Sequence, residues 1–294
     1  MSQLRPMYAR SAMRQRPFCL YCRGLLARIG AGIIRSFLLA GVVGSASASI
    51  NTSDVVEAES MAPGGARAAH LPRPFEATYT ADYRGLPISA TGIRSLEIIQ
   101  QDQSSTYTFS SKALSLFAKL NETSTFRTRG TALQPLRYQY ERTGLGKNKT
   151  QDLHFDWQEG VVTDRAQNDQ YSLNREAHFS DRLLYQLQLQ VDLFNANEDD
   201  INTGVWTYEI FDSGRIKQYA FEVAERELLT TELGPIQTLR LEKKNDDPDK
   251  RTTLWLAPTL EYMLIRFIQE DGRNSFSLEL QAASIEGEPV KLEE

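Results

Sequence analysis

From Phe75 onward the chain alternates between apolar and polar positions with a period of two residues. The first run places Phe75, Ala77, Tyr79, Ala81 and Tyr83 on one face, with polar side chains between them. Such alternation predicts a strand that has one face on a core and the other in water. The same pattern recurs in residues 153–157, 206–210, 219–223 and 276–281.

Further candidate strands follow, separated by short sequences of Gly, Pro, Asp and Ser that are typical of turns. They are residues 88–100, 104–112, 124–130, 136–142, 226–232, 236–243, 252–257 and 262–270. Asp271-Gly272, between two such runs, is a good signal for a type I′ hairpin. Many short strands joined by tight turns predict a mainly β fold, built as a single curved antiparallel sheet or half-barrel.

Residues 180–191 fit two patterns. One is a helical stripe made by Leu183, Leu184, Leu187 and Val191. The other is the alternation of residues 185–191, which is also typical of a strand. The N-cap candidates at Ser180-Asp181 and the acidic loop at 197–200 favour a helix. A helix lying across the concave side of the sheet would bury its stripe, so we expect one or two short helices covering the sheet. Residues 113–120 predict either a helical turn or a loop between strands.

The first 48 residues have the organisation of an export signal. They contain no Lys and no acidic residue, and an apolar stretch near residues 33–43 ends in small residues that include Ala46-Ser47-Ala48. A basic segment, a short apolar segment and an A-x-A site in this order are typical of a cleaved signal peptide. The uninterrupted apolar run is shorter than the roughly 20 residues that span a bilayer. We therefore predict cleavage after Ala48, no stable transmembrane anchor after cleavage, and a periplasmic location.

Removal of this segment changes the charge and the chemistry of the chain. The full chain carries a formal charge of −5, but the segment holds seven of its 33 basic residues, so residues 49–294 carry −12. Nucleic acid is excluded as a partner, because binding it depends on cations that neutralise phosphates. Both cysteines, Cys19 and Cys22, leave with the signal, which excludes disulfides and thiol catalysis from the exported chain.

The remainder divides by composition. Residues 49–74 lack periodicity and are rich in Ala, Ser, Gly and Pro, which predicts a disordered linker in which His70 needs no function. Residues 75–285 form one antiparallel β domain, long enough to bury a core. Residues 286–294 are expected to be an acidic, frayed tail.

The domain offers no motif for catalysis, for a cofactor or for a metal ion. It has no G-x-S-x-G, H-E-x-x-H or Walker sequence, and its only histidines are His154 and His178. We therefore assign no catalytic residue, no cofactor and no metal ligand, and expect a protein that is not an enzyme. A hydrolase would become a serious alternative only if two carboxylates, or His178 and a serine, converged in a pocket.

Three stretches taken together resemble a known family. They are Tyr79-Thr80-Ala81-Asp82-Tyr83-Arg84-Gly85-Leu86-Pro87 leading to Thr91-Gly92; then 181–187; and finally 231–241 followed by 254–258 and 263–266. In this order they resemble the proteobacterial periplasmic domain of unknown function 3108 family over residues 75–283. This chain has Trp255-Leu256-Ala257-Pro258 where the family commonly has a Trp-Leu-Asp turn. The resemblance implies a signal peptide, a mostly β fold and an unassigned function, and it transfers no catalytic residues.

The curved-sheet pattern of that family is similar to lipoprotein carriers of the LolA/LolB type, which hold acyl chains between a half-barrel and its covering helices. We expect a function in the cell envelope, with a lipid or lipoprotein acyl chain as ligand; the alternative is a non-catalytic structural or interaction module that binds an envelope protein. The candidate lining residues are the apolar ones outside clear strands: Leu114, Leu116, Phe117, Leu183, Leu184 and Leu187. Ordinary packing of helix on sheet would account equally for such residues.

Overall fold

The structure is a computed structural model, and it describes residues 70–83, 89–101, 104–115, 118–144, 148–245, 247, 249–272 and 274–291. The predicted signal peptide, its two cysteines and most of the predicted linker lie outside the described residues. Residues from 65 onward form one compact unit, and only this unit is described below.

Within the described residues strands dominate. In chain order they are β1 (Phe75–Tyr83), β2 (Ser89–Gln101), β3 (Ser104–Leu114), β4 (Ala118–Arg129), β5 (Ala132–Gly144), β6 (Lys149–Asp156), β7 (Val161–Asp164), β8 (Asp169–Ser172), β9 (Phe179–Ser180), β10 (Val205–Asp212), β11 (Arg215–Thr231), β12 (Gly234–Lys243), β13 (Lys250–Ala257), β14 (Met263–Asp271), β15 (Asn274–Ile285) and β16 (Glu288–Pro289). The helices are α1 (Leu184–Asn195), α2 (Glu198–Thr203) and a 3-10 turn, η1 (Pro258–Leu260).

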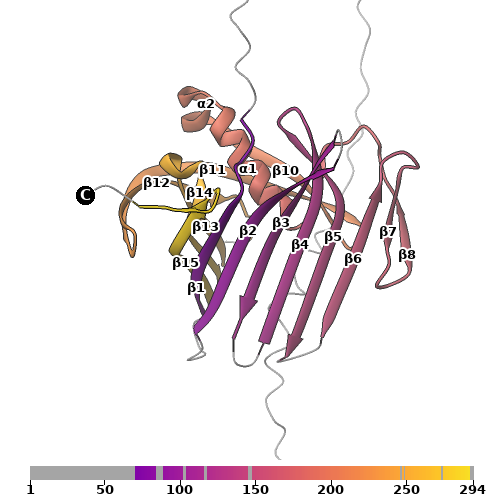
Figure 1. Cartoon of the computed structure of the whole chain (residues 1–294), viewed down its shortest axis with the longest axis horizontal. Coiled ribbons are helices and arrows are strands. Elements are labelled where there is room, and N and C mark those ends of the chain that lie inside the picture. The colour runs from indigo at the N-terminus through magenta and orange to yellow at the C-terminus, as the bar shows by residue number, and fades with distance from the viewer. Residues whose placement is uncertain are drawn as a thin grey trace, which may run out of the picture. The chain divides into compact units, whose positions relative to one another are not determined.

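All the strands belong to one curved sheet. Its order is β8-β7-β6-β5-β4-β3-β2-β1-β15-β14-β13-β12-β11-β10-β9, with β16 added beside β15 (Figure 1). Neighbouring strands are antiparallel, except that β9 runs parallel to β10. The described strands do not close into a barrel. The predicted fold class, a single curved antiparallel sheet with one or two short helices, is therefore confirmed.

Each predicted strand overlaps an observed one, and most of the observed strands are longer. The runs at 219–223 and 226–232 are both parts of β11, which continues through a bulge between Val223 and Glu225. Residues 113–120 are not a helical turn: they end β3 and begin β4, and the described part of the connection is a turn in which Ser115 contacts Ala118. The reason is the register of the two strands, since Ala113 pairs with Leu120 and Leu114 pairs with Lys119.

Helix α1 confirms the helical interpretation of residues 180–191, and its position explains why that sequence fits two patterns. Leu184, Leu187 and Val191 pack into a core cluster with strands β2 to β7, whereas Leu189 and Leu193 pack into a second cluster with strands β10 to β15. The helix lies between two walls of the curved sheet (Figure 1). A helix buried on two sides needs apolar residues on both, and in α1 the residues Leu187, Leu189, Val191 and Leu193 therefore alternate with polar ones as in a strand.

The carboxylate of Asp181 satisfies the first turn of α1. It accepts hydrogen bonds from the backbone N–H groups of Leu183 and Leu184 at 2.9 and 2.8 Å and another from the hydroxyl of Ser124 on β4. Asp181 is completely buried, and burial raises its pKa to about 6 in spite of these hydrogen bonds. The ionised carboxylate therefore links helix to sheet at a cost in stability.

Asp181→Asn should stabilise the protein at pH 7.5 and lose most of that advantage at pH 4.5. The folded-state pKa is raised above the unfolded value of 3.8, so ionisation disfavours folding progressively as the pH rises from about 4 to 6 and fully above that range. The expected gain in the free energy of unfolding is about 3 kcal/mol at pH 7.5 and about 1 kcal/mol at pH 4.5. Urea unfolding of both proteins at the two pH values measures it. A difference that stays constant with pH would contradict the assignment.

Aromatic side chains pack between strands β6 to β8 and strands β9 and β10, the two ends of the sheet. We call this contact the seam. Phe179 of β9 stacks on Trp157 with ring centroids 5.1 Å apart and contacts Phe155 of β6 and Phe211 of β10. Tyr171 of β8 meets Phe211 edge-on at 5.6 Å. Side-chain packing therefore joins strands β6 to β8 to strands β9 and β10, where the order of backbone pairing ends.

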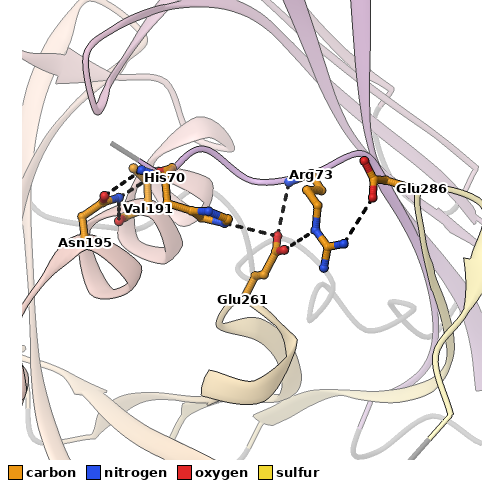
Figure 2. A network of polar contacts seen from close by, with 6 residues as sticks. All are labelled: His70, Arg73, Val191, Asn195, Glu261 and Glu286. Carbon is orange, nitrogen blue, oxygen red and sulfur yellow. Dashed lines mark hydrogen bonds and ion pairs between the residues drawn. The ribbon is translucent and has the colours of Figure 1, made fainter. Parts of the chain in front are cut away.

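The chain before β1 is held against the end of α1 (Figure 2). The side chain of Asn195 accepts from the backbone N–H of His70 and donates to its carbonyl, both at 2.8 Å, and the His70 ring stacks on Phe194. Arg73 forms ion pairs with Glu261, which follows η1, and with Glu286. The predicted linker thus extends too far, because residues 70–74 have specific partners on the domain.

The predicted frayed tail also needs correction at its beginning. Residues 286 and 287 form a turn after β15, and β16 pairs with β15 through Ser284–Pro289 and Ile285–Glu288. The backbone N–H of Val290 also donates to Ala283. The turn, β16 and this hydrogen bond therefore hold residues 286–290 against the sheet, and residues 292–294 lie outside the described residues.

Candidate functional site

The residues predicted to line a ligand site do not gather in one place. Leu183, Leu184 and Leu187 are buried to 0–1% exposure in the core cluster between α1 and the sheet. Leu114 is 61% exposed at the end of β3, and its register places it on the face opposite Ala113, away from the helix. Leu116 and Phe117 lie outside the described residues. The helix residues therefore pack as a filled core, and a ligand surface has to be sought elsewhere on the concave face.

Helix α1 covers only part of the concave face. Along β15, Leu280 is fully buried, whereas Leu278 and Phe276, which point to the same side, are partly exposed. Along β11, Phe221 is fully buried and Tyr219 and Lys217 are partly exposed. Exposure thus increases toward the ends of the strands that carry the β14–β15 and β10–β11 turns. We call these partly exposed, inward-facing positions the open part of the concave face.

One side of the open part is apolar. A single row of residues in register runs across seven neighbouring strands: Val223, Leu241, Leu254, Phe267, Leu278, Ala81 and Ala90. Residues in register share a face of the sheet, so this row is continuous. Val223, Phe267 and Leu278 are partly exposed, whereas Leu241 and Leu254 between them are buried. Phe276 extends the surface with its ring 6.1 Å from that of Phe267. We call Val223, Leu241, Leu254, Phe267, Phe276 and Leu278 the apolar row.

The other side of the open part is polar and mainly basic. On strands β2 to β6, one row in register contains Arg94, Ser111, Glu122, Tyr140 and Gln151, and the next contains Gly92, Ala113, Leu120, Arg142 and Lys149. Arg182, which precedes α1, reaches the same place with its guanidinium 5.2 Å from the centre of the Tyr140 ring. Lys217 and Lys243 face it from β11 and β12. We call Arg94, Arg142, Lys149, Arg182, Lys217 and Lys243 the basic cluster.

Tyrosine rings and few carboxylates surround the basic cluster. The ammonium group of Lys243 lies 3.4 Å from the centre of the Tyr219 ring, and that of Lys149 lies 5.8 Å from the Tyr140 ring. Lys217 pairs with Asp212. Glu122 accepts a hydrogen bond from the hydroxyl of Tyr138 at 2.6 Å. Cation–π contacts of this kind stabilise a cation less than a close carboxylate does in a desolvated site.

Burial and repulsion by neighbouring cations act together on Lys149 and Lys243. Burial lowers the pKa of Lys243 to about 8, with a further lowering by Lys217. Burial also lowers the pKa of Lys149, and the charges of Arg182, Arg142 and Lys217 add to this effect. The influence of Lys217 and Arg182 on Lys149 shows that side chains from β6, from β11 and from the start of α1 form one electrostatic site.

A separate pocket of about 590 Å³ lies beside α1, and it brings His178 and Ser180 together. Its walls come from the start of β5, from β9 and β10, and from Gln188 and Asp192 of the helix. Asp192 accepts hydrogen bonds from Gln188 at 2.7 Å and from the Tyr208 hydroxyl at 2.9 Å, and burial raises its pKa.

The arrangement in this pocket is not that of a nucleophile with its base. The hydroxyl of Ser180 is buried without a hydrogen-bond partner in the described part of the chain, and the carboxylate of Asp192 is engaged by Gln188 and Tyr208. An activated serine requires a base within hydrogen-bond reach. His178 and Ser180 share a pocket, as the hydrolase alternative requires, but they do not form the pair that its chemistry needs.

The described residues contain no group of three or more His, Cys, Asp or Glu side chains arranged to hold a metal ion. Among the same residues, no helix has the length and apolar character needed to cross a bilayer.

The sequence model of a protein family of unknown function, DUF3108, matches residues 78–281. The chain belongs to the DUF3108 family. The match begins in β1 and ends in β15, so it covers both walls of the sheet, α1 and the open part of the concave face. No curated protein matches the chain.

Solved structures with a similar arrangement are distant. A β-barrel-like protein of the DUF1849 family from Brucella abortus has 11% sequence identity and a TM-score of 0.46, with 74% of this chain and 99% of that chain covered. A candidate lipoprotein from Parabacteroides distasonis has 9% identity and a TM-score of 0.33, with coverages of 73% and 97%. A candidate exported protein with a YmcC-like fold from Bacteroides fragilis has 9% identity and a TM-score of 0.29, with coverages of 74% and 100%.

Proposed function

We propose that this DUF3108 protein is an exported binding protein of the cell envelope, located in the periplasm, that holds an acyl chain on the open part of its concave face. The observation that carries the proposal is the apolar row. Its members Val223, Phe267 and Leu278 continue the core cluster beyond the helix and remain partly exposed. Exposed apolar surface that is continuous with a core is typical of a binding surface.

The energy available from such a surface is sufficient. Burial of a 14-carbon chain at about 0.8 kcal/mol per methylene offers about 11 kcal/mol before the costs of association are subtracted. The β sheet supplies a rigid wall, because each strand of the apolar row is paired on both sides. Little ordering of the protein is then needed on binding, which preserves affinity.

Binding of an apolar fluorophore tests the proposal. The purified protein should enhance the fluorescence of N-phenyl-1-naphthylamine, and oleyl alcohol should displace the dye. Leu278→Gln places a polar group in the apolar row and should weaken dye binding about tenfold, which corresponds to about 1.4 kcal/mol.

Ile93→Gln is the matched control. Ile93 lies on β2, is 37% exposed, and belongs to the opposite face from Arg94 and the helix. This variant should change dye binding less than twofold. The proposal is wrong if the protein neither enhances the dye nor releases lipid on solvent extraction, or if the two variants have equal effects. An interaction module without a lipid site would give that negative result.

A further inference from the structure

Within the described part of the chain, four cations on the inner face of the sheet lack the carboxylate partner that three arginines on its outer face have. Arg137, Arg240 and Arg266 point outward, and each lies within 2.9 Å of a carboxylate on the same or a neighbouring strand. On the inner face, Arg94, Lys149, Arg182 and Lys243 have no carboxylate within 4.0 Å among the described residues. Their contacts are instead the rings of Phe109, Tyr140 and Tyr219 and the amide of Gln186.

Arg94 is the most deeply placed of these cations. Its residue is 5% exposed, one terminal nitrogen donates to the Gln186 side chain at 2.8 Å, and its Nε is buried with no hydrogen-bond partner among the residues that the structure describes. A guanidinium that is buried without a carboxylate is costly to maintain. Arg94 also lies two residues from Leu96 on β2, and Leu96 packs in the core cluster under α1. Arg94 therefore marks the border of the region that the helix covers.

The charge balance of this place is opposite to that of the whole exported chain. The basic cluster has six cations; Glu122 acts on Arg94 and Arg182, and Asp212 acts on Lys149 and Arg182. Residues 49–294 carry a net charge of −12. Concentrated positive charge in the concave face of an acidic protein therefore needs a local explanation, and an anion supplies one.

We propose that the ligand is an anionic amphiphile, whose carboxylate or phosphate head is bound by the basic cluster while its acyl chain lies along the apolar row. This inference rests on the proposed function and adds the chemistry of the head. The two surfaces adjoin, because Lys243 lies on β12 two residues beyond Leu241, and both side chains point to the concave side. Lysine and arginine bind carboxylate and phosphate oxygens through charge-assisted hydrogen bonds.

The basic cluster also discriminates against a neutral ligand. Its cations repel one another, so an anion that enters relieves repulsion as well as forming hydrogen bonds. A neutral head would leave Arg94, Lys149, Arg182 and Lys243 without a carboxylate within 4.0 Å among the described residues. An anionic amphiphile is therefore expected to bind at least tenfold more tightly than a neutral one with the same chain.

Competition against N-phenyl-1-naphthylamine with three ligands of one chain length tests the inference. They are oleate, 1-oleoyl-lysophosphatidic acid and oleyl alcohol, and inorganic phosphate serves as a head without a chain. Oleate or the lysophosphatidic acid should displace the dye at concentrations at least tenfold lower than oleyl alcohol, and inorganic phosphate should not displace it.

The double variant Lys149→Gln/Lys243→Gln should weaken oleate binding about tenfold and leave oleyl alcohol within twofold. Lys112→Gln/Lys119→Gln is the control with the same change of charge, because both lysines are exposed and pair in register with residues of the outer face. It should leave all the ligands within twofold. Thermal unfolding checks that each variant is folded.

The possible results separate the two proposals. If oleyl alcohol binds as tightly as oleate, or if the two double variants behave alike, the anionic head is refuted and the acyl-chain site stands. If no ligand with a chain displaces the dye, the proposed function fails and this inference fails with it. Displacement by inorganic phosphate would refute the assignment of the dye to the apolar row.

Discussion

Leu187→Ala should lower the free energy of unfolding by about 2–5 kcal/mol. Leu187 lies in the middle of α1, is 0% exposed, and packs in the cluster formed by the helix and strands β2 to β7. Truncation removes buried apolar surface and leaves a cavity that the paired strands cannot readily close. Urea unfolding followed by circular dichroism measures the loss.

Leu114→Ala provides the comparison, because sequence reasoning gave Leu114 and Leu187 the same role. Leu114 is 61% exposed on the outer face, so its truncation should change the free energy of unfolding by less than about 0.5 kcal/mol. A loss at Leu187 no larger than that at Leu114 would show that α1 does not pack tightly on the part of the concave face that it covers. The ligand site would then have to include the helix.

The fold could be predicted from the sequence because strands and helix each leave a local signal. Alternation from Phe75 to Tyr83 requires a half-buried strand, and the same reasoning found the runs that became β6, β10 and β15. The lengths of the strands were less accessible. Residues 219–223 and 226–232 were predicted as separate strands, yet pairing with β12 joins them through a bulge into β11, which is a property of the fold and not of either segment.

The residues predicted to line an apolar site are not those of the proposed surface. Apolar residues outside strands were taken as lining, yet Leu183, Leu184 and Leu187 are the core under the helix. The apolar row instead consists of strand residues that look like ordinary core positions in the sequence. Only the position of α1 decides which of them remain uncovered, and no local pattern contains that information.

The basic cluster did leave a signal that was not used. In β12 the inward positions run Leu239, Leu241 and Lys243, and in β5 they run Tyr138, Tyr140 and Arg142. A cation that continues the apolar face of an alternating strand must lie inside the sheet or at its rim. The same pattern in several strands would have predicted a basic interior.

Gly214→Ala should lower the free energy of unfolding by about 2–5 kcal/mol in total. Gly214 is in the β10–β11 turn with φ +77°, where an L residue costs about 1–2 kcal/mol. A Cβ atom there would also lie 2.3 Å from the Tyr171 ring. Tyr171 packs against Phe211 in the seam, and displacing its ring from this contact should add about 1–3 kcal/mol.

Gly272→Ala isolates the second effect. Gly272 is in the β14–β15 turn with φ +61°, but a Cβ atom added there meets nothing within 4 Å. This variant should lose only the backbone part, about 1–2 kcal/mol. The difference between the two variants in urea unfolding then measures how tightly the aromatic seam holds the two edges of the sheet together. Equal losses would mean that Tyr171 moves freely, and the seam would then be an opening through which a ligand could reach the concave face.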